Sequence, residues 1–472
     1  MASEWSTSVD LHLLIDGAEP GGRRTALEAA LRDAIRSGRL QPGARLPSTR
    51  ALAADLALAR GTVTEAYDGL VAEGWLVARQ GSGTAVAARP ETAGRRASRR
   101  PSLEDTEPPR HDLRPGSPDL SAFPRAAWSA ALRRALREVP DRTLGYSDPN
   151  GIPQLRIALA GYVGRARGVR TTAEQIVICS GWAQALSLLA AVMATTDRDT
   201  IALEDPCIAL YRDTISRAGL RSHPMTVDEM GADPSSLPDG VGAVVLTPAH
   251  QYPMGTTLAP TRRAAFVEWA RSSDAFIIED DYDGEFRYDR QPVGALQGLD
   301  PERVVYAGTA SKSLAPGLRL AWLALPERLV DAVAETKRLA DRHTGVLDQL
   351  AFAQLIEGGG FDRHLRAARV RYRRRRDALV AALAERVPLL QPEGIAAGLH
   401  MLLPLRATGP REAEVVASLA ANGVAVHGLS SYWHHRGRHA GGLVVGYGTP
   451  SEHAYRAAVD ALTLTLRQAR AG

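Results

Sequence analysis

The chain has 472 residues, of which 45% are hydrophobic and 23% charged, and its formal net charge is +4. This length exceeds what one hydrophobic core usually serves, so we expect two or more domains of ordinary globular composition. Two cysteines, Cys179 and Cys207, exclude a disulfide framework, and neither a signal-peptide pattern nor an apolar run of membrane-spanning length is present. We therefore expect a soluble cytoplasmic protein without membrane contact, whose basic balance permits nucleic-acid binding.

The first 88 residues carry the pattern of a small helical domain. Apolar side chains recur at helical spacing in three segments; Gly38 ends the first, and Ser48 is placed to cap the second. Beyond Gly74, two short strand-like runs flank the segment 81–84. Three helices and a hairpin predict a winged helix-turn-helix, whose apolar positions are Leu27, Leu31, Ala34 and Ile35, then Leu52, Ala53 and Leu56, then Val63, Ala66, Tyr67 and Leu70.

Residues 89–111 are rich in Pro, Arg, Ser and Glu and show no apolar periodicity. We interpret them as a flexible, solvated linker between domains, because charged runs of this kind are usually just solvated. The alternative is that four of their arginines contact DNA phosphates, namely Arg95, Arg96, Arg99 and Arg100.

Residues 112–472 alternate helical segments with short apolar runs at 201–204, 243–247, 275–279 and 320–323. This alternation predicts an α/β domain with a mostly parallel sheet. Ligands of such sheets bind beyond the carboxyl ends of the strands, and both Asp280 and Lys312 follow strand-like runs.

Lys312 is the strongest chemical signal in this part of the chain. It follows Thr309 and Ser311 at the end of a strand-like run, and Arg319 comes seven residues later. An amine in this setting can form a Schiff base with an aldehyde, while hydroxyls and a guanidinium can hold a phosphate. The pattern predicts a site for pyridoxal 5'-phosphate.

The segment 38–87 closely resembles the GntR family of winged-helix regulators. The resemblance rests on Leu46-Pro47-Ser48-Thr49-Arg50, Arg60-Gly61-Thr62-Val63 and Gly81-Ser82-Gly83-Thr84, spread over about fifty residues. It implies that the third helix enters the major groove of double-stranded operator DNA. We expect contacts from two arginines, from short hydroxyl side chains and from the wing backbone: Arg50, Arg60, Ser48, Thr62, Thr64 and Gly83.

The remainder resembles fold type I aminotransferases, with a large mostly parallel α/β domain and a small α+β C-terminal domain. The whole chain therefore resembles the MocR subfamily of GntR regulators, and Ile278-Glu279-Asp280-Asp281-Tyr282-Asp283 matches a signature of that subfamily. The resemblance implies that Asp280 faces the pyridine nitrogen, with Asp281 left as an alternative because neighbouring strand residues face opposite ways. Tyr282 would bind the ring oxygen. A metal is the other chemistry that clustered acids serve, and we expect none here.

The resemblance also implies the residues that surround the phosphate. The helix that begins near 181 would offer its N-terminus to this anion, and Tyr146 would reach the phosphate of a neighbouring subunit, which predicts a homodimer. The expected phosphate contacts within one subunit are Ser180, Trp182, Ala183, Thr309, Ser311 and Arg319.

Several positions depart from catalytic relatives. Either His250 or Gln251 is expected near the ring oxygen, and Ile208 replaces a tyrosine that normally stacks on the ring. An arginine that binds an effector carboxylate in one relative is Leu210 here. The arginine that holds the substrate carboxylate in aminotransferases aligns with Gly442, with Arg436 or Arg438 as possible substitutes.

The residues that anchor a cofactor are thus better retained than those that recognise an amino acid. This asymmetry favours a DNA-binding transcriptional regulator that senses pyridoxal phosphate, or an amine or amino-acid effector, at Lys312. Two alternatives remain: a working aminotransferase that carries a DNA-binding arm, and an empty dimerisation scaffold. The arginine run at 369–376 is expected to lie on a solvated helix.

Overall fold

The computed structural model describes residues 22–79, 83–88, 109–288, 293–406, 409–435, 437 and 439–469. The chain separates into two compact units, an N-terminal unit of residues 1–106 and a C-terminal unit of residues 107–472. Most of the predicted linker lies outside the described residues, including Arg95, Arg96, Arg99 and Arg100, and so do Gly81, Ser82, Arg436 and Arg438.

The N-terminal unit is a winged helix-turn-helix, as predicted. Helix α3 buries Val63, Ala66, Tyr67 and Leu70, so the whole predicted apolar face is confirmed. Ser48 caps α2 by accepting a hydrogen bond from the backbone of Ala51 at 3.2 Å. The elements are α1 (Gly22–Arg36), α2 (Thr49–Asp55), α3 (Arg60–Ala72) and the antiparallel hairpin of β1 (Leu76–Arg79) and β2 (Gly83–Val86).

The C-terminal unit is built on an eight-stranded sheet that is mostly parallel, as predicted. Strand β11 runs antiparallel to both of its neighbours, and β7 runs antiparallel to β6. The strands in spatial order are β4 (Ile176–Cys179), β11 (Ala321–Ala324), β10 (Val304–Thr309), β9 (Phe276–Asp281), β8 (Val241–Leu246), β5 (Thr200–Asp205), β6 (Arg221–Asp228) and β7 (Gly231–Ala232).

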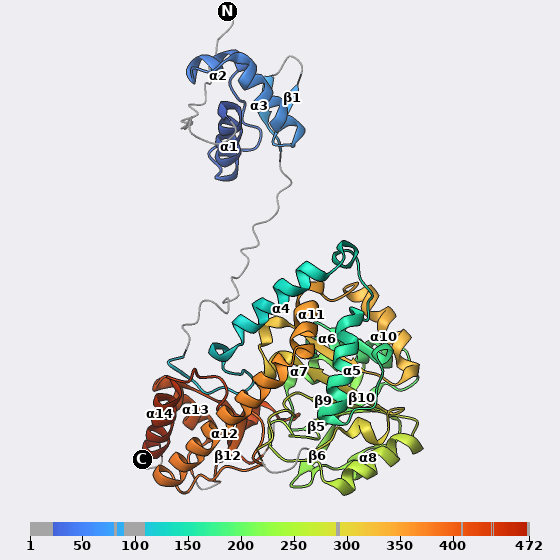
Figure 1. Cartoon of the computed structure of the whole chain (residues 1–472). Helices are drawn as coiled ribbons and strands as arrows, with labels where there is room; N and C mark the ends of the chain where they lie inside the picture. Colours follow the sequence, from blue (N-terminus) through green and yellow to red (C-terminus); the bar gives the residue numbers. More distant parts are fainter. Residues whose placement is uncertain are drawn as a thin grey trace, which may run out of the picture. The chain divides into compact units, whose positions relative to one another are not determined.

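Helices cover both faces of this sheet (Figure 1). One core packs the sheet against α6 (Trp182–Met193), α7 (Ala209–Arg217) and α10 (Glu327–Ala340). The cores on the other face include α5 (Pro153–Arg167), α8 (Pro260–Ser272) and α11 (Val346–Glu357), with α4 (Arg125–Glu138) against α11. The one-turn helix α9 (Ala310–Ser313) follows β10 directly.

A smaller subdomain completes the C-terminal unit. Its antiparallel sheet contains β12 (His400–Pro404), β15 (Gly442–Gly446) and β14 (His427–Gly428). Its helices are α12 (Gly360–Arg386), α13 (Glu412–Ala421) and α14 (Tyr455–Gln468), and β3 (His111–Asp112) pairs in parallel with β13 (Val424–Ala425). The segment that follows the linker is therefore anchored to this subdomain.

The arginine run on α12 is not wholly solvated, which corrects the prediction. Arg375 is only 2% exposed and forms an ion pair with Asp119 at 2.7 Å. It also donates to the carbonyl oxygens of Gly448 and Pro450. Such pairing is what allows a guanidinium to be buried, so this residue ties α12 to two loops of the C-terminal unit.

Two further properties follow from the described residues. None of their helices is both long and apolar enough to span a bilayer. Cys179 and Cys207 are free and buried, and burial raises the pKa of each thiol to about 12. Neither forms a disulfide, as the sequence led us to expect.

Candidate cofactor-binding site

A cavity of about 560 Å³ lies where the large sheet meets the small subdomain. Its walls include the carboxyl ends of β9 and β10, the first turns of α6 and α7, and the start of β12. This is the position at which parallel α/β sheets bind ligands. Asp280 and Lys312 both line it, as the sequence predicted from their places after strands.

The chain has one other lysine besides Lys312 that could supply a side-chain amine. Of the 57 lysines and arginines in the chain, only Lys312 and Lys337 are lysines. Lys337 is fully buried and forms an ion pair with Asp341 at 2.8 Å. The pKa of Lys312 is lowered by burial, against the opposing attraction of Asp280 and Asp283. Burial thus favours the neutral amine, which is the nucleophilic form.

The amino group of Lys312 donates a hydrogen bond to the carbonyl oxygen of Gly116 at 2.6 Å. Gly116 lies a few residues beyond β3. Backbone bonds connect the same segment to the subdomain sheet, where Gly446 donates to Leu113 at 2.7 Å. The lysine therefore contacts the stretch of chain that follows the linker.

Asp280 and Asp281 face opposite sides of β9, which separates the two alternatives. Asp281 forms a buried ion pair with Arg167 at 2.6 Å and accepts a hydrogen bond from Tyr306, so its carboxylate is fully engaged in the core. Asp280 lines the cavity instead and accepts a short hydrogen bond from Tyr211. Burial raises the pKa of Asp280 to about 7, while the hydrogen bond from Tyr211 and the charge of Lys312 act in the opposite direction.

An anion-binding end of the cavity lies around the start of α6. Arg319 lines it and donates to the carbonyl oxygen of Ser180 at 2.6 Å. Gly181 has φ +89°, and a Cβ atom there would lie 2.5 Å from the guanidinium of Arg319, so only glycine fits. Trp182 and Ala183 also line this end, and the buried indole nitrogen of Trp182 has no partner among the described residues.

Thr309 and Ser311 lie on the same wall. The Thr309 hydroxyl caps α9 by accepting from the Ser311 backbone at 3.2 Å, and it lies 3.0 Å from the Ser311 hydroxyl. Unlike these two, Ser180 does not line the cavity; its backbone positions Arg319. The sequence had placed all three in direct contact with a phosphate.

Of the residues expected near a ring oxygen, Tyr282 lines the cavity and Gln251 does not. Tyr282 lines the cavity, and its hydroxyl donates to the carbonyl oxygen of His250 at 2.9 Å. Gln251 lies behind the wall, where its amide donates to Pro206 and Tyr252. Its side chain is thus used to hold a loop. His250 does not line the cavity either, so among these three residues Tyr282 is the one placed to contact a ring substituent.

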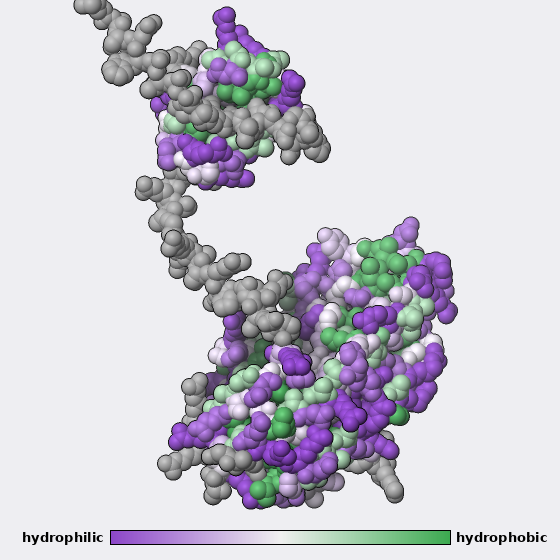
Figure 2. All heavy atoms as spheres, turned by 90° about the vertical axis from the view of Figure 1, so that its left-hand side faces the viewer, coloured by the Kyte–Doolittle hydropathy of each residue, from purple (hydrophilic) through white to green (hydrophobic). Residues whose placement is uncertain are grey.

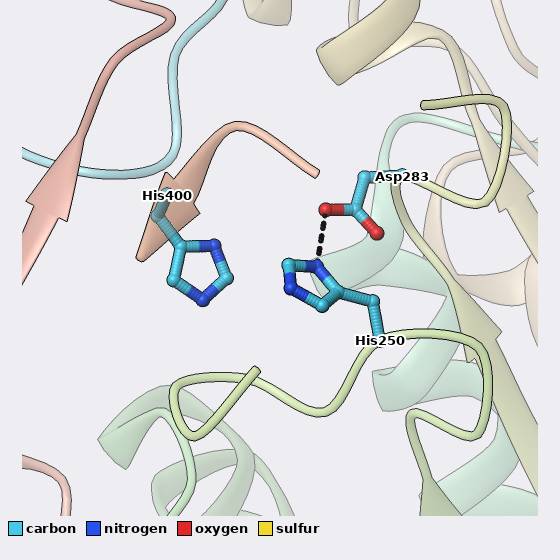
Figure 3. Close-up of side chains that lie close together, drawn as sticks. All are labelled: His250, Asp283 and His400. Atoms are coloured by element: carbon cyan, nitrogen blue, oxygen red, sulfur yellow. Dashed lines mark hydrogen bonds and ion pairs between the residues drawn. The ribbon is translucent and has the colours of Figure 1, made fainter. Parts of the chain in front are cut away.

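Three buried side chains form a group in this region, as Figure 3 shows. His250 Nδ1 lies 2.9 Å from an Asp283 carboxylate oxygen, and the His250 and His400 rings are 4.8 Å apart between centroids. Their ligand atoms all lie within 4.8 Å of one another. His250 and Asp283 are already paired with each other, and the amine of Lys312 lines the same cavity. The described geometry fits a hydrogen-bonded dyad beside a second histidine better than a metal site.

Gly398 makes this arrangement possible. Its φ is +69°, and a Cβ atom there would lie 2.3 Å from both Asp283 Oδ2 and His250 Cε1. A left-handed backbone conformation with no side chain is what only glycine supplies at low cost. The loop before β12 therefore packs directly onto the dyad.

The remaining predicted positions fall on two surfaces. Ile208 and Leu210 line the cavity, with Ile208 packed against the cluster of Leu402, Leu429 and Tyr432. Tyr146 lies elsewhere, with 82% of its surface exposed. Figure 2 shows hydrophobic patches on one face of the C-terminal unit, and such patches are typical of protein interfaces.

The exposed surface of the N-terminal unit carries the predicted DNA contacts. Arg60 and Thr64 lie exposed in the first turns of α3, and Arg50 lies exposed at the start of α2. Thr62 is half-buried, and Gly83 begins the second wing strand with φ +79°. Ser48 uses its hydroxyl as a cap, so its contact with DNA would have to come in addition to that role.

These residues fit pyridoxal phosphate. The phosphate requires donors, which Arg319, the unpartnered Trp182 indole and the free N–H groups at the start of α6 supply. The pyridine nitrogen requires an acid, which Asp280 supplies, and the aldehyde requires an amine with a lowered pKa, which is Lys312.

Three features of the site escaped sequence reasoning. Tyr211 lies one helical turn after Ile208, and that spacing could have suggested it. Asp283 was visible in the acidic motif but had no assigned role. His400 follows Gly398 on a buried strand, and nothing local marks it, because its neighbours come from elements that are distant in the sequence.

Comparison with known proteins agrees with this architecture. Residues 23–86 match the family of bacterial regulatory proteins, gntR family, and residues 117–438 match aminotransferase class I and II. The chain is 33% identical to the HTH-type pyridoxine biosynthesis transcriptional regulator PdxR of Corynebacterium glutamicum, over 95% of this chain and 96% of that protein. It is 34% identical to the probable rhizopine catabolism regulatory protein MocR of Rhizobium meliloti, over 74% and 75% respectively.

A solved structure resembles the C-terminal unit. The kynurenine aminotransferase of Pyrococcus horikoshii is similar with a TM-score of 0.70 and 25% sequence identity, over 78% of this chain and 92% of that one.

Proposed function

Because the chain belongs to the MocR-type subfamily of GntR transcriptional regulators, which join a winged helix to an aminotransferase class I and II domain, we propose that pyridoxal phosphate or an amine effector bound at Lys312 modulates its binding to operator DNA. The observation that carries this proposal is the convergence of Lys312, Asp280 and Arg319 on one cavity. When bound, the cofactor would supply an electrophilic aldehyde carbon and an electron-withdrawing ring.

The chain's own residues then have distinct tasks. Arg319 and the start of α6 would hold the anion, Asp280 would hold the ring nitrogen, and Tyr282 would orient the ring through its hydroxyl. Lys312, whose pKa burial lowers, would supply the nucleophilic amine that joins the aldehyde carbon with release of water.

The hydrogen bond from Lys312 to Gly116 supports a route from the cavity to the linker. If Lys312 Nζ were joined to an aldehyde carbon, with release of water, it would keep fewer N–H donors. Its hydrogen bond of 2.6 Å to Gly116 would then be weakened or lost. The segment around Gly116 then exchanges one set of contacts for another. A ligand that favours one of two such arrangements shifts the population toward it, which is all that regulation requires.

We also propose that the protein works as a homodimer. Tyr146 is highly exposed, and the Arg342 guanidinium lies 4.2 Å from its ring centroid. Leu144 and Leu347 are large apolar side chains that are also exposed, at 55% and 45%. A second copy of the chain would cover them and bring Tyr146 toward the partner's phosphate site.

The scarcity of lysine makes the cofactor proposal simple to test. The protein is loaded with pyridoxal phosphate, reduced with borohydride and digested, and the phosphopyridoxyl mass is located by mass spectrometry. We expect it on the peptide that contains Lys312 and not on the one that contains Lys337. Operator binding, measured by fluorescence anisotropy, should change with the cofactor in the native protein and not in Lys312→Ala.

Two results would argue against the proposal. Label on Lys337 instead of Lys312, or no label at all, contradicts the cofactor site. Operator affinity that is identical with and without cofactor contradicts modulation. Rapid transfer of the amino group from ordinary amino acids would instead favour a working aminotransferase with a DNA-binding arm.

A further inference from the structure

The effector end of the cavity has an unusual charge distribution. Arg319 is committed to the anion-binding end, where it donates to Ser180. Among the described lining residues at the opposite end, no lysine or arginine is present, whereas Asp283 adds a carboxylate. Arg212 reaches this wall only from outside, where it donates to the carbonyl oxygen of Tyr432 at 3.0 Å, and it does not line the cavity.

Gly442, where the resemblance leads us to expect a carboxylate-binding arginine, is surrounded by apolar side chains. A Cβ atom on Gly442 would lie 3.0 Å from Leu402 Cδ1 and 3.3 Å from Leu429 Cδ2. Both leucines belong to a buried apolar cluster with Val444. A longer side chain at this position would have to shift them, and glycine itself supplies no cation to the cavity.

The polar groups on this wall are mutually satisfied. The hydroxyls of Tyr252 and Tyr432 lie 2.8 Å apart, and Tyr432 lies 2.7 Å from His427 Nδ1. Burial lowers the pKa of His427, so near pH 7 this chain of groups carries no positive charge. A carboxylate placed here would lose its hydration without gaining a cationic partner.

His400 is the exception, because it has an unused nitrogen. Nε2 is buried and has no partner among the described residues. The ring does form a hydrogen bond with the backbone of Pro253, which has no N–H, so the other nitrogen, Nδ1, must be the donor. Burial, followed by the neighbouring His250, lowers the pKa of His400 well below its usual value, so the ring stays neutral. Nε2 is therefore a lone, buried acceptor in a ring that lines the cavity.

Taking the proposed function as the starting point, we infer that the effector is an amine that lacks a carboxylate and carries a hydroxyl group, which donates a hydrogen bond to His400 Nε2. The chemical class is an amino alcohol rather than an amino acid. The amine and the hydroxyl both donate hydrogen bonds. Donors suit this wall because Asp283 and His400 Nε2 can both accept. The apolar body of the effector would pack on Ile208 and Leu399.

Three commercial amines that share one side chain test this inference. L-leucinol, L-leucine and isoamylamine differ only in carrying a hydroxymethyl group, a carboxylate or a hydrogen on the amine-bearing carbon. Each is titrated into the cofactor-loaded protein by calorimetry, and operator anisotropy is followed in parallel. We expect leucinol to bind about 100-fold more tightly than leucine, since an unpaired buried carboxylate costs several kcal/mol. We expect leucinol to bind about 3- to 10-fold more tightly than isoamylamine, the ratio of affinities that corresponds to one net hydrogen bond.

Variants assign the preference to one atom. His400→Phe removes the acceptor and should make leucinol and isoamylamine equal. His400→Gln keeps a side-chain oxygen that can accept, and should retain part of the preference. His434→Phe is the matched control, because this partly buried histidine does not line the cavity, and it should behave as the native protein.

The outcomes separate this inference from the proposed function. Leucine binding as tightly as leucinol, no binding of any of the three amines, or an unchanged preference in His400→Phe would overturn the amino-alcohol inference while the visible absorbance of the loaded protein still supports the cofactor site. Protein that never acquires this absorbance contradicts the proposed function, and the inference fails with it.

Discussion

Tyr211 offers the most informative perturbation of the cofactor site. Its hydroxyl donates to the carboxylate of Asp280, and both side chains are buried. Tyr211→Phe removes one donor and changes little else in volume. The hydrogen bond from Tyr211 lowers the pKa of Asp280, which burial alone has raised, so its loss moves that pKa further above about 7.

The magnitude follows from this hydrogen bond. A bond to a charged acceptor contributes about 1.5–3 kcal/mol, and each 1.4 kcal/mol is a factor of ten in affinity. At pH 7 a smaller fraction of Asp280 is ionised in the variant, so less of it can pair with a protonated ring nitrogen. We expect pyridoxal phosphate to bind about 10- to 100-fold more weakly to Tyr211→Phe at pH 7.

The pH dependence identifies the cause. As the pH rises from 7 to 9, Asp280 ionises in both proteins, and the ratio of their affinities should shrink. The assay is a spectrophotometric titration with pyridoxal phosphate at several pH values. Tyr162→Phe is the matched control, because Tyr162 is a buried tyrosine that donates to Glu285 at 3.1 Å outside the cavity, and its loss should leave the affinity unchanged. Equal affinities of Tyr211→Phe and the native protein, or a ratio that does not vary with pH, would refute this reasoning.

Three further predictions concern stability, the anion site and DNA. In Gly181→Ala the new methyl group meets the guanidinium of Arg319, and we expect a lower melting temperature and at least about tenfold weaker cofactor binding, measured by thermal melting and titration. Burial raises the pKa of Glu204 to about 7, so the stability that this carboxyl contributes below its unfolded-state pKa is lost as the pH rises through 7. In urea titrations, Glu204→Gln should narrow the difference in unfolding free energy between pH 5 and pH 8 by about 2–3 kcal/mol. An unchanged difference would show that Glu204 does not titrate in this range. Arg60→Ala should weaken operator binding and lower its salt dependence by about one ion, whereas Arg39→Ala, an exposed arginine paired with Asp33, should not; equal losses in anisotropy titrations would argue against α3 as the reading helix.

The parts of the fold that depend on local periodicity were predictable from the sequence. The buried face of α3 and the strands β5, β8, β9 and β11 follow from spacing and from apolar runs, within a residue or two at each end. Arg375 was not predictable, because its partner Asp119 lies 256 positions away. A charge run reveals nothing about such a partner.

The site shows the same division. Lys312 and Arg319 could be named because short motifs carry them. The sequence could also show that Asp280 and Asp281 face opposite sides of one strand, but not which side faces the cavity. The spacing from Ile208 hints at Tyr211, but its partner Asp280 and the position of His400 became visible only when α7, β9 and β12 were brought together. The unused acceptor on His400 is a property of its surroundings, and no pattern within one segment encodes it.

The contact between Lys312 and Gly116 has a thermodynamic consequence for the regulator as a whole. If capture of the cofactor alters DNA affinity by some factor through this contact, then DNA must alter cofactor affinity by the same factor, since the two binding events share one free-energy cycle. Binding of an operator fragment would therefore change the affinity of the protein for the cofactor. Through the amino nitrogen of Lys312, the occupancy of operator sites and the supply of cofactor would each affect the other.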